Sequence, residues 1–215
     1  MKLSNRLSAV AELVEKSDNV ADVGCDHAYL SIYLAENDLC NNIIATEVNE
    51  GPYNIAINNI KKYELDNKIK IYLTDGLMDI EESLNTIVFA GMGATTIINI
   101  LKNYKYLDNI NKLIIQSNND LELLRRYLNA NGFYIIREVY INENKKDYIT
   151  ILAIKMNKMN SKEELIMGVY NHLNKDFYLN QKNKIKDILK KIPNTDDINY
   201  QKNKEKLDIL KKYIS

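Results

Sequence analysis

Three stretches of this 215-residue chain place acidic residues or glycines directly after β-rich runs, where they could bind a nucleoside. In the first stretch a single glycine, Gly24, stands between Asp22 and Asp26. A dinucleotide pyrophosphate needs two or three close glycines, so that backbone N–H groups can surround the phosphates. One glycine between two carboxylates instead suits a ligand with positive groups, such as a sulfonium beside an amino group.

Two further acids stand in comparable places. Glu47 follows the second β-rich run, where a carboxylate can accept both hydroxyls of a ribose. Asp75-Gly76 follows the third run, where a carboxylate can accept the exocyclic amine of adenine. Each acid also has a structural alternative, since Glu47 could cap the next helix and Asp75 could form a turn. The occurrence of all three features after successive runs favours a ligand site.

These residues need a parallel sheet to bring them together. Short β-rich runs alternate with helical stretches over the first 155 residues, a pattern typical of an α/β sheet covered on both faces. The predicted strands are residues 19–23, 43–46, 69–73, 86–90 and 113–116. The predicted helices are residues 2–16, 29–36, a segment starting near Gly51-Pro52, 95–102 and 121–131. The acids therefore fall at the carboxyl ends of strands, where open α/β sheets bind nucleotides.

The end of this region follows another pattern. Residues 133–141 and 148–156 are two long β-rich runs joined by a polar turn, residues 142–146, with no room for a helix between them. Such runs must pair as an antiparallel hairpin. Five alternating units finished by a hairpin predict the methyltransferase version of the Rossmann-like topology rather than the dehydrogenase version.

The last part of the chain reads as helical. Apolar residues recur at helical spacing on either side of a turn at 193–196. They are Ile185, Ile188, Leu189 and Ile192 before the turn and Leu207, Leu210 and Ile214 after it. We expect two domains, 1–158 and 159–215, the second a small α-helical coiled-coil hairpin.

Charge is distributed unevenly over these two parts. Residues 1–160 hold 17 Lys and Arg against 21 Asp and Glu, whereas residues 161–215 hold 12 against 8. The basic tail indicates either a polyanionic partner or a lysine-rich helix face exposed to solvent.

The remaining composition narrows the class of protein. No apolar run approaches the roughly 20 residues that cross a bilayer, and the start lacks the apolar stretch of a signal peptide, so we expect a cytoplasmic protein without membrane contact. Cys25 and Cys40 form no metal-type pair, and we expect both to stay thiols. With only His27 and His172 as further ligands, we expect no metal site.

The loop after the fourth strand, Ala90-Gly91-Met92-Gly93, has two glycines that let a flat base approach the backbone. It lacks the acid or asparagine followed by two prolines that many enzymes use to methylate exocyclic amines. Such an amine must rehybridise and lose a proton, whereas a ring nitrogen with a free lone pair needs no such help. The loop therefore favours a ring nitrogen as the acceptor.

Together these segments resemble the bacterial tRNA (adenine-N1)-methyltransferases that modify adenine 22 in the D-arm, the TrmK family. The matching segments are Leu3-Ser4-Asn5-Arg6-Leu7, residues 21–30, residues 47–52, Asp75-Gly76-Leu77, residues 90–93, Gln116-Ser117-Asn118 and Asn131-Gly132-Phe133. The family also has a C-terminal helical coiled-coil domain. In this chain Cys25 stands where serine is usual, Ser31 and Ser117 where proline is usual, and Ala94 where a third glycine is usual.

The resemblance implies the cofactor S-adenosyl-L-methionine and a tRNA D-arm as partner. No obligatory protein partner is evident from the sequence. The cofactor-binding residues it implies are Gly24, Cys25, Asp26, His27, Glu47, Val48, Asp75, Gly76, Gly91 and Met92. The residues it places against the target base are Asp26, His27, Tyr29 and Asn118. His27 has a structural alternative, since it could serve only to hold the glycine turn together.

Three other functions remain open at this point. The nearest is methylation of another RNA position or of a small molecule, because fold and cofactor site do not name the acceptor. A nicotinamide oxidoreductase is disfavoured by the single-glycine turn and the terminal hairpin. A non-catalytic RNA-binding module is disfavoured by the presence of Asp26, Glu47 and Asp75.

Overall fold

The structure is a computed structural model, and it describes residues 1–16, 18–169 and 175–214. It divides into two compact units, Met1–Met159 and Asn160–Ser215, which are described separately below. His172 lies outside the described residues, as does the side chain of Ile214.

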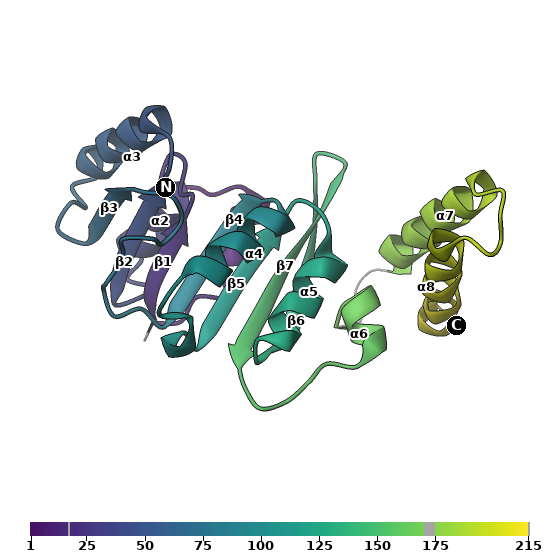
Figure 1. Cartoon of the computed structure of the whole chain (residues 1–215). Coiled ribbons are helices and arrows are strands. Elements are labelled where there is room, and N and C mark those ends of the chain that lie inside the picture. The colour runs from purple at the N-terminus through teal and green to yellow at the C-terminus, as the bar shows by residue number, and fades with distance from the viewer. Residues whose placement is uncertain (17, 170–174, 215) are drawn as a thin grey trace. The chain divides into compact units, whose positions relative to one another are not determined.

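The first unit is built on a seven-stranded sheet with the order β3-β2-β1-β4-β5-β7-β6 (Figure 1). The strands are β1 Asn19–Val23, β2 Asn42–Glu47, β3 Ile69–Leu73, β4 Thr86–Met92, β5 Lys112–Ser117, β6 Phe133–Glu143 and β7 Lys146–Lys155. Strands β1 to β5 run parallel, and β7 pairs antiparallel with both β5 and β6. The predicted Rossmann-like methyltransferase sheet with a terminal hairpin is confirmed.

Helices cover both faces of this sheet, as a mostly parallel sheet requires because its strands are buried on both sides. The helices of the unit are α1 Asn5–Ala11, α2 Tyr29–Glu36, α3 Glu50–Lys62, α4 Ala94–Asn103 and α5 Leu121–Ala130, with a short 3-10 turn, η1, at Leu107–Asn109. Helices α4 and α5 contact each other and lie in front of the sheet in Figure 1. Helices α1, α2 and α3 share one hydrophobic core with β1 and β2.

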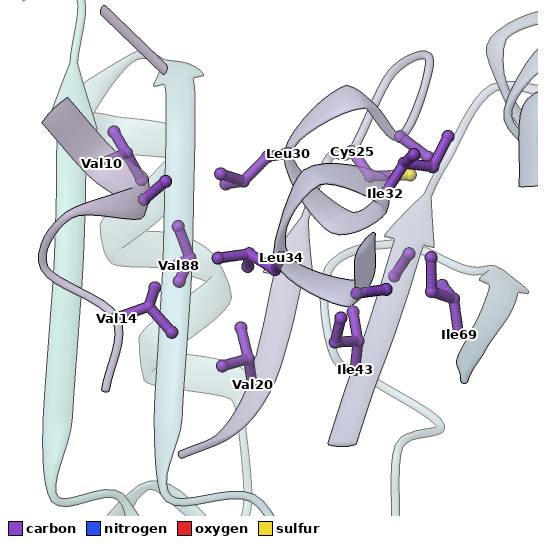
Figure 2. Close-up of a cluster of buried hydrophobic side chains, with 14 of the residues drawn as sticks. Val10, Val14, Val20, Cys25, Leu30, Ile32, Leu34, Ile43, Ile69 and Val88 are labelled. Atoms are coloured by element: carbon purple, nitrogen blue, oxygen red, sulfur yellow. The ribbon is translucent and has the colours of Figure 1, made fainter. Parts of the chain in front are cut away.

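Figure 2 shows part of this core, in which side chains of α2 meet those of the strands. Ile32 and Leu34 are fully buried, as are Val20 of β1 and Val88 of β4. Each such aliphatic side chain contributes about 1.5–3 kcal/mol by leaving water. This packing fixes the start of α2, and with it the loop that joins β1 to α2.

Most strands and helices differ from the prediction by only one or two residues at an end, and two elements differ more clearly. Helix α1 spans seven residues instead of fifteen: Ser4 caps its start, and after Ala11 the chain continues in tight turns that bury both Leu13 and Val14. The predicted five-residue turn of the hairpin is a two-residue turn, because Asn144 and Lys145 both adopt positive φ (52° and 63°). That conformation matches the right-handed twist of the paired strands.

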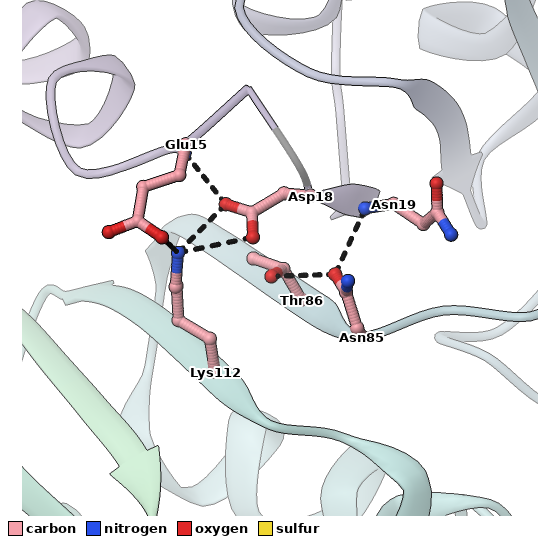
Figure 3. Close-up of polar contacts among 6 residues, drawn as sticks. All are labelled: Glu15, Asp18, Asn19, Asn85, Thr86 and Lys112. Atoms are coloured by element: carbon pink, nitrogen blue, oxygen red, sulfur yellow. Dashed lines mark hydrogen bonds and ion pairs between the residues drawn. The ribbon is translucent and has the colours of Figure 1, made fainter.

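A polar cluster ties the strands together at their amino ends, opposite the carboxyl ends that carry the predicted site (Figure 3). The Lys112 ammonium lies 3.0 Å from the carboxylate of Asp18 and 2.9 Å from that of Glu15. Beside them Asn85 Oδ1 accepts hydrogen bonds from the Asn19 backbone N–H and the Thr86 hydroxyl. These contacts join β5 and the entry to β4 to the segment that leads into β1.

The second unit is helical, with α6 Lys162–Met167, α7 Lys175–Lys191 and α8 Ile198–Ile214. Its core joins Ile166 and Met167 of α6 to Tyr178 and Ile185 of α7, and to Ile209 and Leu210 of α8. Of the predicted apolar stripe, Ile188 is 45% exposed and lies outside this core. Helix α6 was not predicted, although Ser161 and Glu164 form a capping box, a recognisable helix-start pattern.

Candidate active site

The loop from Gly24 to Ala28 forms the centre of the predicted site, at the carboxyl end of β1. Gly24 has a φ of +68°, and a Cβ there would lie 2.1 Å from the end of the Met92 side chain. The positive φ therefore favours glycine, and any larger residue would also have to displace the flexible end of the Met92 side chain. Asp26 and Ala28 also have positive φ (52° and 59°), so the loop turns sharply before α2 begins.

Asp22 lies beneath this loop and is only 3% exposed. Its carboxylate accepts a hydrogen bond from the Ser31 hydroxyl at 2.6 Å, which links β1 to α2. Burial raises the pKa of Asp22 to about 6, because ionisation is unfavourable away from water. Asp22 thus supports the loop and adds negative potential, while Asp26 is the acid at its surface.

Glu47 ends β2 with a carboxylate held by backbone N–H groups. Its Oε1 accepts from the N–H of Val48 and of Asn49, each at 3.0 Å, and from the Asn49 side-chain amide at 3.2 Å. Its Oε2 accepts from the N–H of Asp26 at 3.1 Å. Asn49 is the N-cap residue of α3, so these bonds hold the segment that leads into the helix and do not cap its first turn. Oε2 has a further lone pair, so it could also accept a hydrogen bond from a ribose hydroxyl.

Asp75 and Gly76 lie in the turn after β3, beside Glu47. The Thr74 N–H donates to the Glu47 carbonyl at 2.9 Å, which joins this turn to the end of β2. Asp75 is exposed, and Gly76 is buried with a φ of +64° against Ile100 of α4. The structure therefore places both acids, Glu47 and Asp75, at one edge of the sheet.

Hydrogen bonds join the end of β4 to the end of β5 and to the residues that follow β5. A bulge follows Ala90, so that Gly91 stands out of register with β5. The Asn118 N–H donates to the Met92 carbonyl at 2.9 Å, and the Asn118 side-chain amide donates to the Gly91 carbonyl at 2.5 Å. Ser117 Oγ lies 2.9 Å from the Asn119 carbonyl oxygen. The Ser117 side chain thus forms a hydrogen bond within this segment, at the position where proline is usual in the family.

Asp26, His27 and Tyr29 form a group at the rim. The rings of His27 and Tyr29 are stacked, with centroids 5.5 Å apart and planes within 8°. His27 Nε2 lies 3.4 Å from Asp26 Oδ1, and Tyr29 is 46% exposed. The His27 carbonyl accepts from the Asn59 side chain of α3 at 3.0 Å, which fixes the backbone of the turn. The group brings a carboxylate and two aromatic rings together at the start of α2.

Cys25 differs from its neighbours because its side chain packs into the core shown in Figure 2. Burial, and then the nearby carboxylates of Asp22 and Glu47, raise the pKa of its thiol, so it stays protonated. Only the backbone of Cys25 is placed to line the loop. Burial likewise raises the pKa of Cys40 to about 12.

Two residues without a predicted role lie behind this site. Arg6 of α1 donates to Oε1 of the fully buried Gln116 at 2.6 Å, and its guanidinium lies over the Tyr148 ring, 5.7 Å from the centroid. A Cβ on Gly91 would lie 3.1 Å from Arg6 Nη1, so Arg6 reaches the wall of the site. In the sequence, a glutamine directly after the apolar run of residues 113–115 indicates a polar contact at the end of β5, although it does not name Arg6 as the partner.

Comparisons with known proteins agree with this geometry. Residues 3–152 match a family model described as a methyltransferase domain. The Bacillus subtilis tRNA (adenine(22)-N(1))-methyltransferase is 35% identical over 155 residues, which cover 71% of this chain and 65%, less than two thirds, of that protein. The solved structure of M. capricolum TrmK in complex with S-adenosyl-homocysteine is similar with a TM-score of 0.86 at 31% identity, covering 100% of this chain and 98% of that one.

This chain belongs to the TrmK family. The solved structure of the B. subtilis tRNA methyltransferase TrmK is also similar over the whole length, with a TM-score of 0.86 at 26% identity, covering 100% of this chain and 99% of that chain. Family membership confirms the resemblance predicted from the motifs.

Two further features of the described residues bear on function. No three His, Cys, Asp or Glu side chains among them are grouped so as to hold a metal ion. None of the helices within residues 1–16, 18–169 and 175–214 is long and apolar enough to span a membrane.

Proposed function

We propose that this protein transfers a methyl group from S-adenosyl-L-methionine to N1 of adenine 22 in the D-arm of tRNA, in the cytoplasm. The observation that carries the proposal is the single-glycine loop between buried and exposed carboxylates, at the carboxyl ends of strands in a TrmK-family sheet. A pyrophosphate would meet carboxylates there, whereas a cation is attracted to them.

The residues around the loop fit such a cofactor. Gly24, Asp26 and His27 would line its methionine end together with the backbone of Cys25. Glu47 and Val48 would hold the ribose, and Asp75 and Gly76 the adenine, with Gly91 and Met92 as the floor. When bound, the cofactor supplies a methyl group activated by a sulfonium.

The target base needs orientation more than proton transfer. N1 of adenine has a free lone pair at neutral pH, so the protein needs no general base for the attack. Methylation places a positive charge on the base, and the exposed Asp26 carboxylate can stabilise that charge as it develops. The catalytic roles of Asp26, His27, Tyr29 and Asn118 are therefore positioning, electrostatic stabilisation and exclusion of water.

An adenine in the D-arm must leave its stack to expose N1, which costs a few kcal/mol. The stacked rings of His27 and Tyr29 offer a flat surface at the rim of the site for an extruded base. Base–aromatic stacking contributes about 1–3 kcal/mol, which is comparable with that cost.

We assign the basic C-terminal helices, residues 159–215, to contact with tRNA phosphates as a coiled-coil domain. Helix α7 carries Lys182, Lys184, Lys186, Lys190 and Lys191, of which all but Lys182 are exposed. Replacing Lys184 and Lys186 by Gln should weaken tRNA binding and reduce its salt dependence by up to about two released counterions. Replacing Lys61 and Lys62, two exposed lysines of α3, is the matched control. An unchanged tRNA affinity in the α7 variant would remove this role.

The test of the whole proposal is transfer of tritium from labelled S-adenosyl-L-methionine to unmodified tRNA with adenine at position 22, beside the same tRNA with guanine there. We expect label only on the adenine-containing tRNA. Equal labelling of both would keep the methyltransferase and move the target elsewhere. An absence of label on either, with cofactor binding shown by calorimetry, would assign another acceptor.

A further inference from the structure

A chain of hydrogen bonds runs from α1 to the loop that faces the predicted base. Arg6 Nη1 donates to Gln116 Oε1 at 2.6 Å, Gln116 Nε2 donates to Asn118 Oδ1 at 3.4 Å, and Asn118 Nδ2 donates to the Gly91 carbonyl at 2.5 Å. Gln116 is fully buried and Asn118 is exposed. These hydrogen bonds therefore connect the interior of the domain to the surface of the site.

The direction of each bond in this chain is fixed by chemistry. A guanidinium has five N–H donors and no acceptor, so the Gln116 atom that faces Arg6 must be the oxygen. The Gln116 nitrogen must then face Asn118, which presents its oxygen in return. The Gly91 carbonyl, which can only accept, holds the Asn118 nitrogen from the other side. Both ends of the chain impose the same orientation on the Asn118 carboxamide.

This orientation determines what Asn118 can offer a ligand. A carboxamide oxygen has two lone pairs, and the Gln116 bond uses one of them. The second lone pair of the exposed Asn118 is an acceptor of fixed position. Adenine carries an amine donor next to N1, so an acceptor here can orient N1 by holding the neighbouring amine.

We propose that Gln116, held by Arg6, is a positioning residue that fixes the Asn118 oxygen as the acceptor for the exocyclic amine of the target adenine. This inference rests on the proposed function. Gln116 itself is fully buried, so it acts through the exposed Asn118. Arg6 contributes because it fixes the orientation of the Gln116 amide.

The test combines variants of Gln116 with a change in the base. Gln116→Glu keeps an acceptor for Arg6 but cannot donate to Asn118, and Gln116→Met removes both bonds without adding charge. Each variant of the full chain is assayed for kcat/KM on two tRNAs, with adenine or with purine at position 22. Purine keeps N1 but lacks the amine. Cofactor affinity and thermal unfolding are measured in parallel.

If the inference holds, both variants lose about tenfold or more in kcat/KM on the adenine tRNA and less than about threefold on the purine tRNA. The wild-type preference for adenine over purine should shrink by the ratio of the two losses, at least about threefold. Equal losses on the two tRNAs would overturn the inference, since a merely structural role affects both alike. If one variant does not fold, the other decides.

The two proposals fail in different ways. If the wild-type protein transfers no methyl group to adenine-22 tRNA, the proposed function is wrong and the inference falls with it. If the wild type is active and its preference for adenine over purine survives in both Gln116 variants, only the inference is wrong.

Discussion

Replacement of Asp22 by Asn tests how the interior beneath the site is built. The Asp22 carboxyl is 3% exposed, and its pKa is raised from 3.8 to about 6, chiefly by burial. A rise of about two pH units means that ionisation costs the folded protein roughly 3 kcal/mol. Because the folded state binds this proton more tightly than the unfolded state, the wild type should lose stability as pH rises from about 4 to 6, and then level off.

An Asn at position 22 is neutral throughout this range and can still accept the Ser31 hydroxyl bond. The amide replaces one acceptor oxygen by a buried NH2 donor beside the Ser31 hydroxyl and backbone N–H, which we expect to cost about 1–2 kcal/mol at every pH. Because this cost does not depend on pH, the change of the stability difference with pH reports only the ionisation of Asp22. Relative to wild type, Asp22→Asn should gain about 1.5 kcal/mol of stability between pH 5 and 7.5.

Urea unfolding of both proteins at several pH values measures this difference. The matched control is Asp66→Asn, which changes an exposed carboxylate in the same unit. We expect its free energy of unfolding to stay nearly parallel to that of the wild type. If the difference between Asp22→Asn and wild type does not change with pH, or decreases as pH rises, Asp22 is not a carboxyl with a raised pKa and the reasoning is refuted.

Three further predictions concern the site and its support. Gly24→Ala, which puts a Cβ at positive φ against Met92, should lower cofactor affinity at least about tenfold by calorimetry; an unchanged affinity would show that the loop adapts. Glu47→Gln replaces one acceptor oxygen by an NH2 group that faces backbone N–H donors, so it should also weaken cofactor binding, about 10- to 100-fold. The control Glu64→Gln, which changes an exposed carboxylate, should leave cofactor binding unchanged. Arg125→Met leaves the buried Glu138 unpaired and should cost about 3–5 kcal/mol in urea unfolding, most of it recovered by adding Glu138→Leu; a cost below about 1 kcal/mol would contradict a buried ion pair.

Much of the fold could be predicted because it depends on local patterns. The strands at 19–23 and 69–73 and the helix at 29–36 have the predicted bounds, since apolar runs and turn residues mark both of their ends. Helix α1 was predicted too long because its apolar spacing continues through Leu13 and Val14. Those residues are buried by turns instead, and periodicity alone does not distinguish the two.

The candidate site was partly predictable for a similar reason. Strand ends place Glu47, Asp75 and Gly91 at the same edge of the sheet, because all parallel strands expose their carboxyl ends there. The link from Arg6 to Gln116 was not predictable, because it joins residues 110 positions apart through the packing of α1 against the sheet. Spacing along the sequence carries no information about such a contact.

The acids around Gly24 act as one electrostatic group rather than as separate contacts. Burial is the main reason why the pKa of the Cys25 thiol and that of Asp22 are raised, and the neighbouring carboxylates add to it: Asp22 and Glu47 for Cys25, and Glu47 for Asp22. Another negative charge is therefore unfavourable at the loop. A cation bound there would weaken these repulsions together. The effect can be measured through Asp22, because its raised pKa makes stability depend on pH. If S-adenosyl-L-methionine binds at this loop, saturating amounts should lower the pKa of Asp22 and flatten the pH dependence of wild-type stability between pH 5 and 7.5.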